Sequence, residues 1–383
     1  MKKRLEPVSK TSVTPESICR GSRKRRLDSR LGRAGMTLLA EGTFLRWLVL
    51  SLSLIVLLPL VLSAQGFTKA GTSAAQFLKI PVGAKAASMG NAYSSIGSDA
   101  TALYWNPACV AGLNRLQGTV AHSSWIAGLM HNFAGVVVPM GDRSAIGISG
   151  IALQSEKIEQ TTIENPRGTG VFYDALDLAL GITYSRSMTE FVDIGVTGKY
   201  ISQRIWSESG QTFALDFGAV LKTGFKDLKL GVSFQNFGPG LTMGGRELIR
   251  QLDQDPASTA NPYIETTVQT QQWDLPTSYR VTTSMSLVGT DGLVTMSGSR
   301  FLIALDAIHL NDNPEHYSIG GEYEFQGILA IRGGYVFKTD EEGLTLGLGV
   351  NIPAGGSVFT LDYAYAAFGL LGSVSYFSVS AAF

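Results

Sequence analysis

The sequence predicts an all-β fold, a transmembrane barrel of about fourteen antiparallel strands with an N-terminal, partly helical plug. Two observations carry this prediction. Segments of about ten residues in which apolar and polar side chains alternate recur from residue 117 to the carboxyl terminus. The chain also ends inside such a segment, so its last strand has no tail to cover its edge and needs a partner. A closed ring of strands supplies that partner.

The composition agrees with a membrane barrel. Only 16% of the residues are charged, against about 25% in a typical soluble domain. Residues 1–64 hold 12 of the 31 Lys and Arg residues, which leaves the rest of the chain with a net charge near −8. Such an acidic body argues against nucleic-acid binding. Cys109 is the one cysteine after residue 64, so neither a disulfide framework nor a thiolate metal site is expected.

Residues 1–64 are interpreted as a targeting region. An apolar run at 47–62 is shorter than the ~20 residues that a spanning helix needs, follows Arg46, and ends at Leu62-Ser63-Ala64. This pattern is typical of a secretory signal peptide at 36–64, cleaved before Gln65. A retained membrane anchor is the alternative. The basic residues 1–35 are then a mis-assigned start or a disordered extension.

Residues 65–116 are predicted to form a hatch inside the barrel. They contain small residues, turn formers and short helical pieces without strand alternation. A loosely ordered periplasmic lead is the alternative. As a plug or gate, the hatch would act through Phe77, Pro81, Gly83, Ala84, Gly90, Asn91, Asp99, Trp105, Asn106 and Pro107. It would pair with inward charges of the barrel, such as Asp193, Lys199, Asp216, Glu322, Glu324 and Arg332.

Two local signals within the hatch are specific. Gly90-Asn91 is a turn signal. Asn106-Pro107 caps or ends a short helix near Trp105, because a residue before proline avoids the helical conformation.

The barrel is predicted to occupy residues 117–383. A soluble β-sandwich also alternates, but it should not place charged residues opposite so many Leu, Phe and Tyr faces. Lipid outside and water or a plug inside account for both faces. The predicted strands are 117–125, 131–139, 144–155, 176–184, 192–200, 213–221, 228–235, 278–288, 300–310, 316–325, 329–338, 344–352, 358–365 and 372–383.

The connections predict an orientation. If both termini are periplasmic, the odd-numbered connections face outward, and the two longest, 156–174 and 237–277, are the third and the seventh. Most even-numbered connections are short turns. The connection at 289–299 does not fit, because it is even-numbered and not short.

The carboxyl terminus predicts how the ring closes. Phe377, Val379 and Phe383 lie on one face of the last strand, and this strand is expected to pair with the first, near 117–125. The terminal aromatic residue resembles the signal that barrel assembly machinery reads.

The hatch also resembles a known family. Residues 77–93 (FLKIPVGAKAASMGNAY), Ser98-Asp99-Ala100 and Trp105-Asn106-Pro107-Ala108 are similar to the opening of PorV/PorQ outer-membrane proteins, barrel components of the type IX secretion system. These are distant relatives of the FadL long-chain fatty-acid transporters, which share the fourteen-stranded barrel, the hatch and an Asn-Pro-Ala element. The resemblance is dense over 75–113 and only a pattern over 114–383. Cys109 departs from the family's usual Gly.

The resemblance implies an outer-membrane protein of a Gram-negative-type bacterium that acts as a cargo shuttle or docking protein. Its expected partners are outer-membrane lipid, the secretion translocon, the carboxy-terminal signal domain of cargo, an attachment protease and the barrel assembly machinery. The alternative is a FadL-like transporter that takes hydrophobic small molecules through a lumen gated by the hatch. The charged inward faces disfavour a channel that is hydrophobic along its whole length, although one apolar pocket would suffice to bind a hydrophobic small molecule.

An enzyme fits the sequence poorly. The four histidines form no HExxH motif or paired metal spacing, and nothing in the sequence brings a Ser/His/Asp set together. An outer-membrane hydrolase such as a phospholipase stays open as a minor alternative. No catalytic residue, metal ligand or cofactor is predicted. The histidines are His122, His131, His309 and His316.

Overall fold

The computed structural model describes residues 70–253 and 264–383, so the predicted signal peptide and basic extension lie outside the described residues. In this part of the chain, no helix is long and apolar enough to cross a membrane.

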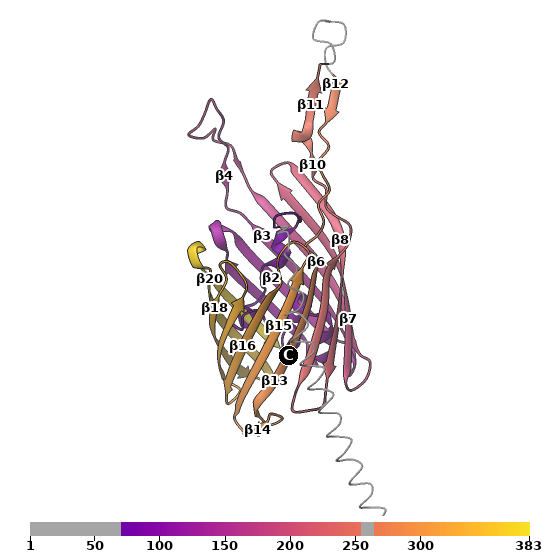
Figure 1. The fold of residues 1–383 in the computed structure, drawn as a ribbon, viewed down its shortest axis with the longest axis vertical. Coiled ribbons are helices and arrows are strands. Elements are labelled where there is room, and N and C mark those ends of the chain that lie inside the picture. The colour runs from indigo at the N-terminus through magenta and orange to yellow at the C-terminus, as the bar shows by residue number, and fades with distance from the viewer. Residues whose placement is uncertain (1–69, 254–263) are drawn as a thin grey trace, which may run out of the picture. The chain divides into compact units, whose positions relative to one another are not determined.

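Within the described residues, fourteen antiparallel strands form a closed barrel, as predicted (Figure 1). Each strand pairs with the next along the chain, except that short extra strands interrupt the order in the connections. The barrel strands are β1 (Gln117–Ser124), β2 (Met130–Pro139), β3 (Ser144–Gln154), β6 (Ala175–Ser187), β7 (Val192–Ile205), β8 (Glu208–Lys222), β9 (Lys229–Phe237), β13 (Ser278–Gly289), β15 (Ser299–Leu310), β16 (His316–Phe325), β17 (Leu329–Phe337), β18 (Leu344–Ala354), β19 (Ser357–Ala367) and β20 (Ser373–Ala382).

The last strand closes the ring on the first. Val379 of β20 pairs with Val120 of β1, and the antiparallel register continues from Gln117 opposite Ala382 to Ser124 opposite Ser375. On its other side β20 pairs with β19. The edge that the sequence left uncovered is therefore fully hydrogen-bonded, which removes the hazard of an open sheet edge.

The strands have an apolar outer face and a polar or small inner face, as their alternation predicts. In β6, Leu180, Ile182 and Tyr184 are exposed on the outside, whereas Thr183 and Ser185, which alternate with them, are fully buried. Exposed apolar side chains on the outer face of a barrel are the surface that lipid covers.

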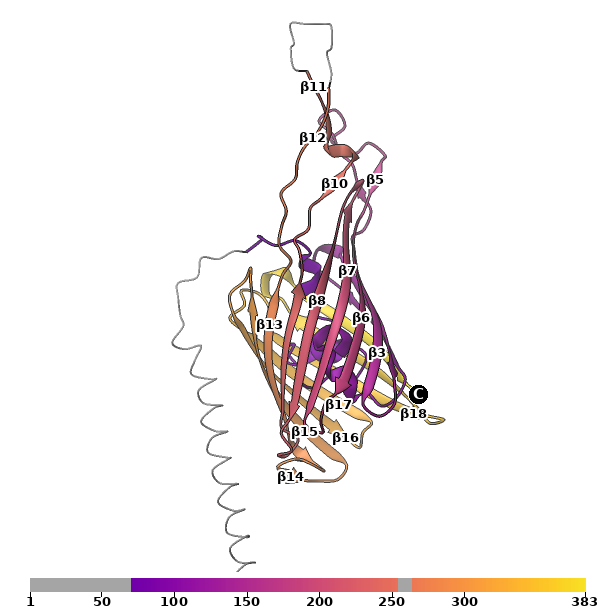
Figure 2. The ribbon, with the colours of Figure 1, turned by 90° about the vertical axis from the view of Figure 1, so that its right-hand side faces the viewer.

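The connections define two ends of the barrel. We call the end that carries the odd-numbered connections the loop end and the other the turn end. The third connection contains β4 (Ile158–Glu159) paired with β5 (Phe172–Tyr173), and the seventh contains β11 (Ile249–Leu252) paired with β12 (Ile264–Thr267). The β11–β12 hairpin projects beyond the ring (Figures 1 and 2).

Two further short strands modify connections. In the seventh, β10 (Gly244–Gly245) pairs with the start of β8. The eighth connection, which did not fit the expected pattern of short turns, contains β14 (Val294–Thr295), and β14 folds back to pair in parallel with the end of β13. Its extra length is therefore ordered at the turn end.

The N-terminal segment lies inside the ring (Figure 2) and forms η1 (Gln76–Lys79), α2 (Ala84–Ser88), α3 (Ala102–Trp105) and η2 (Pro107–Gly112). It begins at the loop end, where Ala74 N donates to Asp274 O (2.9 Å) of the seventh connection. It leaves at the turn end, where Arg115 donates to Gly356 O (3.3 Å). The hatch therefore crosses the whole lumen. The other short 3-10 helices are η3 (Ile126–Gly128), η4 (Arg246–Leu248) and η5 (Gly369–Leu371).

Glycines on the inner face make room for the hatch backbone. A Cβ at Gly334 of β17 would lie 2.2 Å from Gly90 N, and one at Gly320 of β16 would lie 2.3 Å from Met89 O. These contacts need positions without side chains. In β18, a Cβ at Gly347 would likewise lie 2.4 Å from Cβ of Ser88.

Candidate functional site

The centre of the hatch is an aromatic cluster around Trp105. Its indole ring makes edge contacts with Tyr93 (centroids 6.3 Å apart) and Tyr104 (5.0 Å), and its Nε1 donates to Val82 O (2.9 Å). The guanidinium of Arg280 on β13 lies 5.0 Å from the centre of the Trp105 ring. This cation–π contact and the buried rings fix the hatch against one wall of the barrel.

Asn106 and Pro107 act as the predicted helix break. Helix α3 ends at Trp105, and Pro107 is the first residue of η2. Asn106 is fully buried; its Oδ1 accepts from Ala108 N (3.0 Å) and its Nδ2 donates to Ser94 O (2.8 Å) and to the barrel at Val232 O (3.3 Å). The amide therefore satisfies backbone groups on both the hatch and β9.

Cys109, where the resembling family usually has Gly, does not need glycine here. Its φ is not in the left-handed region, and its Sγ lies 3.3 Å from Ser94 O. Burial raises the pKa of the Cys109 thiol to about 12, so the side chain is a buried, neutral group.

Gly90 and Asn91 form the predicted turn, and both have left-handed φ angles of 62° and 68°. Gly90 N donates to Thr345 Oγ1 of β18 (3.1 Å). Asn91 Nδ2 donates to Glu342 Oε1 (2.8 Å), and Asn91 O accepts from Arg280 (2.9 Å). This turn is therefore bonded to three different parts of the barrel.

The other predicted hatch residues have more local roles. Gly83 precedes α2 with φ 87°, and Ala84 N donates to Ser378 Oγ of β20 (2.6 Å). Asp99 accepts from Thr101 N (2.8 Å) and Tyr93 OH (3.2 Å), both within the hatch.

Of the inward charges expected to pair with the hatch, one does so directly. Lys85 of α2 lies 3.2 Å from Glu322 of β16. The other charges pair mainly within the barrel wall, which differs from the expectation. Arg332 holds Glu322 and Asp362 (2.6 Å each), Lys199 pairs with Asp216 (2.6 Å), and Lys222 pairs with Asp193 (2.6 Å). Strands carry both signs of charge at neighbouring positions, so the wall neutralises most of its own buried ions.

A second attachment of the hatch, which sequence reasoning missed, lies at the loop end. Asp312, in the connection between β15 and β16, accepts hydrogen bonds from Gln76 Nε2 (2.8 Å) and Lys79 Nζ (3.0 Å), and from Ser73 Oγ. Burial raises the pKa of Asp312, but these hydrogen bonds outweigh it and lower the pKa overall. The sequence signal, an Asp within Asn-Asp-Asn-Pro, is indistinguishable from an ordinary turn residue.

A cavity of about 720 Å³ lies between the hatch and the loop end. Apolar side chains from the hatch and the strands form most of its wall, and polar groups are spaced around it. We call it the vestibule. Its apolar lining includes Phe77, Leu78, Ile80, Pro81, Tyr104, Trp105, Trp125, Leu129, Leu153, Ile308, Leu310, Val336 and Phe368; its charged lining is Lys79, Arg280, Lys338, Asp340 and Glu342. His316 also lines it.

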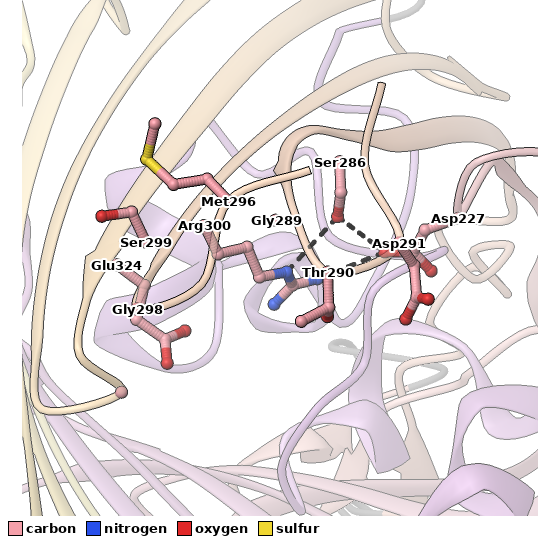
Figure 3. A pocket seen from close by; sticks show the side chains of 11 residues that line it. Asp227, Ser286, Gly289, Thr290, Asp291, Met296, Gly298, Ser299, Arg300 and Glu324 are labelled. Carbon is pink, nitrogen blue, oxygen red and sulfur yellow. Dashed lines mark hydrogen bonds and ion pairs between the residues drawn. The ribbon is translucent and has the colours of Figure 1, made fainter. Parts of the chain in front are cut away.

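The cavities at the turn end have a different character. One of about 270 Å³ is lined by Lys85, Asp99, Arg332 and Asp362 among others, and it shares Arg300 and Glu324 with a neighbour of about 200 Å³. In that neighbour, Arg300 Nε donates to Ser286 Oγ (3.3 Å), and the guanidinium lies 3.6 Å from Asp227 (Figure 3). The vestibule, whose wall is mainly apolar, therefore differs from these more ionic cavities.

Of the predicted assembly residues, Phe377 and Val379 lie on the outer face of β20, and Phe383 follows its last residue. Phe377, Val379 and Phe383 are 51%, 45% and 59% exposed, and the Phe383 ring makes an edge contact with Phe359 (6.3 Å). Their exposure places these side chains on the outside of the barrel.

Comparisons with known proteins identify the fold. No family model matches the chain, and no curated protein matches its sequence, so the PorV/PorQ resemblance gains no support from either. The P. putida toluene transporter TodX is similar in structure, with a TM-score of 0.51 and 11% identity, over 79% of this chain and 97% of that chain. The deltaS2S3 mutant of the TodX monoaromatic hydrocarbon channel gives a TM-score of 0.50 and 12% identity, over 79% and 98%.

A FadL homologue of Pseudomonas aeruginosa gives a TM-score of 0.47 and 14% identity, over 79% of this chain and 98% of that chain. At such identities the two TodX structures establish a shared fold. The chain therefore has the fold of FadL-like outer-membrane barrels.

Proposed function

We propose that the chain is an outer-membrane transporter for hydrophobic small molecules. The observation that carries this proposal is the vestibule, a cavity of about 720 Å³ with a mainly apolar wall. Ligand pockets are of this size and are lined mainly by apolar and aromatic side chains with a few placed polar groups. The apolar outer face of the barrel supports a position in the outer membrane, with the loop end extracellular.

The similar structures support the same class of cargo. TodX is described as a toluene transporter and a monoaromatic hydrocarbon channel, and its barrel shares this fold. In this chain, Trp105 and Trp125 both line the vestibule with aromatic surface, one from the hatch and one from the first connection. A neutral, apolar ligand would bury its surface against these rings and the other apolar side chains of the wall.

A binding measurement tests the proposal. Toluene and a long-chain fatty acid, titrated into the purified protein in detergent, should change the fluorescence of the vestibule tryptophans. Leu153→Asp places a carboxylate in the vestibule wall and should weaken binding at least tenfold, because the ligand would have to desolvate it. Ile163→Asp, at a position 95% exposed in the third connection, is the matched control and should bind normally. Equal binding by both variants would place the ligand elsewhere.

The hatch is proposed to be the gate of this path. Deletion of residues 75–108 should raise the permeability of the outer membrane to detergents and large antibiotics. The full-length chain, expressed to the same level, is the reference. An unchanged permeability after the deletion would mean that the hatch does not close the pore.

Type IX cargo docking is the second candidate, and the loop-end hairpins favour it. Ile163 (95% exposed), Phe172 (56%) and Leu252 (49%) present apolar side chains on or beside them, as a protein-binding surface does. On this proposal, the third and seventh connections contact the translocon, the signal domain of cargo or the attachment protease.

Affinity purification from outer membranes in mild detergent separates the two candidates. Recovery of a large translocon barrel or a surface-attachment protease with the chain would support docking. Recovery of a bound hydrophobic molecule without those partners would support transport. The hairpin substitution Phe172→Ser should reduce only the first outcome, and Leu153→Asp only the second.

A further inference from the structure

Three polar residues lie side by side on adjacent strands at the junction where the barrel closes. Ser123 of β1 is paired in register with His131 of β2 on one side and with Tyr376 of β20 on the other. All three residues are buried, with exposed fractions of 2%, 3% and 2%. They form one row across the first, second and last strands, on the inner face of the barrel.

Their polar atoms lack partners. Within residues 70–253 and 264–383, Ser123 Oγ, His131 Nε2 and Tyr376 OH are all buried without a hydrogen-bond partner. Buried polar groups in folded proteins are nearly always hydrogen-bonded, because an unpaired one forfeits its hydration. Three unpaired atoms on residues that are neighbours across adjacent strands therefore call for a shared explanation.

All three side chains line the same small cavity. Its volume is about 10 Å³, and the hatch residues Pro81, Val82 and Gly83 cover its inner side. That volume is at the lower limit for holding a single water molecule, measured for a water-sized probe. It is far too small for an organic ligand, which distinguishes it from the vestibule.

The chemistry of the three groups also fits water. Serine and tyrosine hydroxyls can each donate or accept, and a neutral imidazole nitrogen can do either, depending on the tautomer. A water molecule offers two donors and two acceptors, and buried waters typically have two to four polar partners. One water can thus satisfy all three orphaned atoms.

We propose that Ser123, His131 and Tyr376 bind one buried water molecule. This water bridges β20, β1 and β2 behind the hatch and adds a side-chain link to the backbone ladder that closes the ring. The site is independent of the proposed transport function, since the cavity holds no part of a hydrophobic ligand.

A crystal structure of the full chain, at a resolution that resolves ordered water, tests the site directly. The expected result is a single density peak within about 2.7–3.2 Å of Ser123 Oγ, His131 Nε2 and Tyr376 OH. Direct hydrogen bonds among the three side chains, with no peak between them, would overturn the proposal. So would a peak that touches only one of them.

A double-mutant cycle tests the bridge in solution. Ser123→Ala and Tyr376→Phe each remove one hydroxyl and leave the rest of the side chain, so both variants should fold. Each should lower the midpoint of thermal unfolding by on the order of 2–4 °C. If both hydroxyls bind the same water, the double variant should lose clearly less than the sum of the two shifts.

The control pairs Ser123→Ala with Thr183→Val. Thr183 of β6 bonds Thr197 (2.7 Å) in a separate network, so these two shifts should add. Additive shifts in the Ser123/Tyr376 pair as well would show that the two hydroxyls share no partner, and would overturn the bridging water.

Discussion

At the scale of single residues, two ion pairs join the hatch to the barrel, Lys79 with Asp312 and Lys85 with Glu322. In the second pair, the two residues differ in how many other charged partners they have. Glu322 is 1% exposed and serves Lys85 of the hatch (3.2 Å) and Arg332 of the wall (2.6 Å) at once. Lys85 is less buried and has Ser98 (3.0 Å) as a further partner. Removing the charge of Glu322 therefore breaks its ion pairs with both Lys85 and Arg332, whereas removing the charge of Lys85 breaks only the first of these.

Glu322→Gln should be the more damaging substitution. It leaves Arg332 and Lys85 short of a buried negative charge, and breaking a buried ion pair in this way costs about 3–5 kcal/mol. Lys85→Met should cost less, because Glu322 keeps Arg332. Urea unfolding, followed by the loss of the heat-modifiable band on gels, measures both. Equal losses would mean that Glu322 does not link the hatch to the wall.

Asp312 predicts a pH dependence of the loop-end attachment. Its folded-state pKa is lowered, so its contribution to stability is present above the unfolded-state pKa of about 4 and is lost as the pH falls through the folded value. Limited proteolysis near residues 73–79 should therefore increase at strongly acidic pH. Asp312→Asn should show increased cleavage already at pH 7 and little further change on acidification. A wild-type pH profile in this variant would contradict the assignment.

At the scale of elements, the hatch and the barrel fit through backbone contact. Residues 88–90 pass so close to β16, β17 and β18 that glycine occupies the facing positions. Adjacent glycines on one strand can face opposite ways, which offers a matched pair of substitutions.

Gly334→Ala should displace the hatch without disrupting β17. Its Cβ would lie 2.2 Å from Gly90 N, a backbone atom that cannot move aside by rotation. The variant should show larger or more frequent channel openings in planar bilayers. Gly333→Ala is the control, because its Cβ would face outward and meet Leu346 at 3.7 Å, an ordinary contact. Identical conductance in both variants would mean that this turn does not seal the lumen.

The sequence predicted elements well and their contacts poorly, for a physical reason. Alternation with a period of two involves only residues that are close in the sequence. The strands, their outward faces and the closure of β20 on β1 could therefore all be inferred. The contacts of the hatch join residues far apart in sequence, such as Lys79 with Asp312 and Asn91 with Glu342. No local pattern distinguishes these partners from ordinary loop residues. The charged residues were correctly placed inward, but pairing within the wall depends on strand register, which the sequence does not give directly.

At the scale of the whole molecule, the ring depends on its last strand. β20 provides one partner for β1 and one for β19. Removal of residues 373–383 should therefore open two edges at once and prevent assembly, so the truncated chain should give no heat-modifiable band. Deletion of hatch residues 75–108 should leave that band in place, since the ladder does not include them. A folded barrel after the first truncation would show that β19 can close on β1.

The hatch contacts that cross the lumen also constrain the order of assembly. The chain runs through the ring from the loop end, where Ala74 bonds Asp274, to the turn end beside Gly356, before β1 begins. If β20 joined β1 first, the described hatch residues, 70–112, would have to be threaded through a ring whose inner face already fits them closely. Docking of the hatch onto the still-open sheet avoids this passage. Because β20, the strand that joins β1, follows the other described barrel strands along the chain, the hatch can dock onto strands β1 to β19 before the ring shuts.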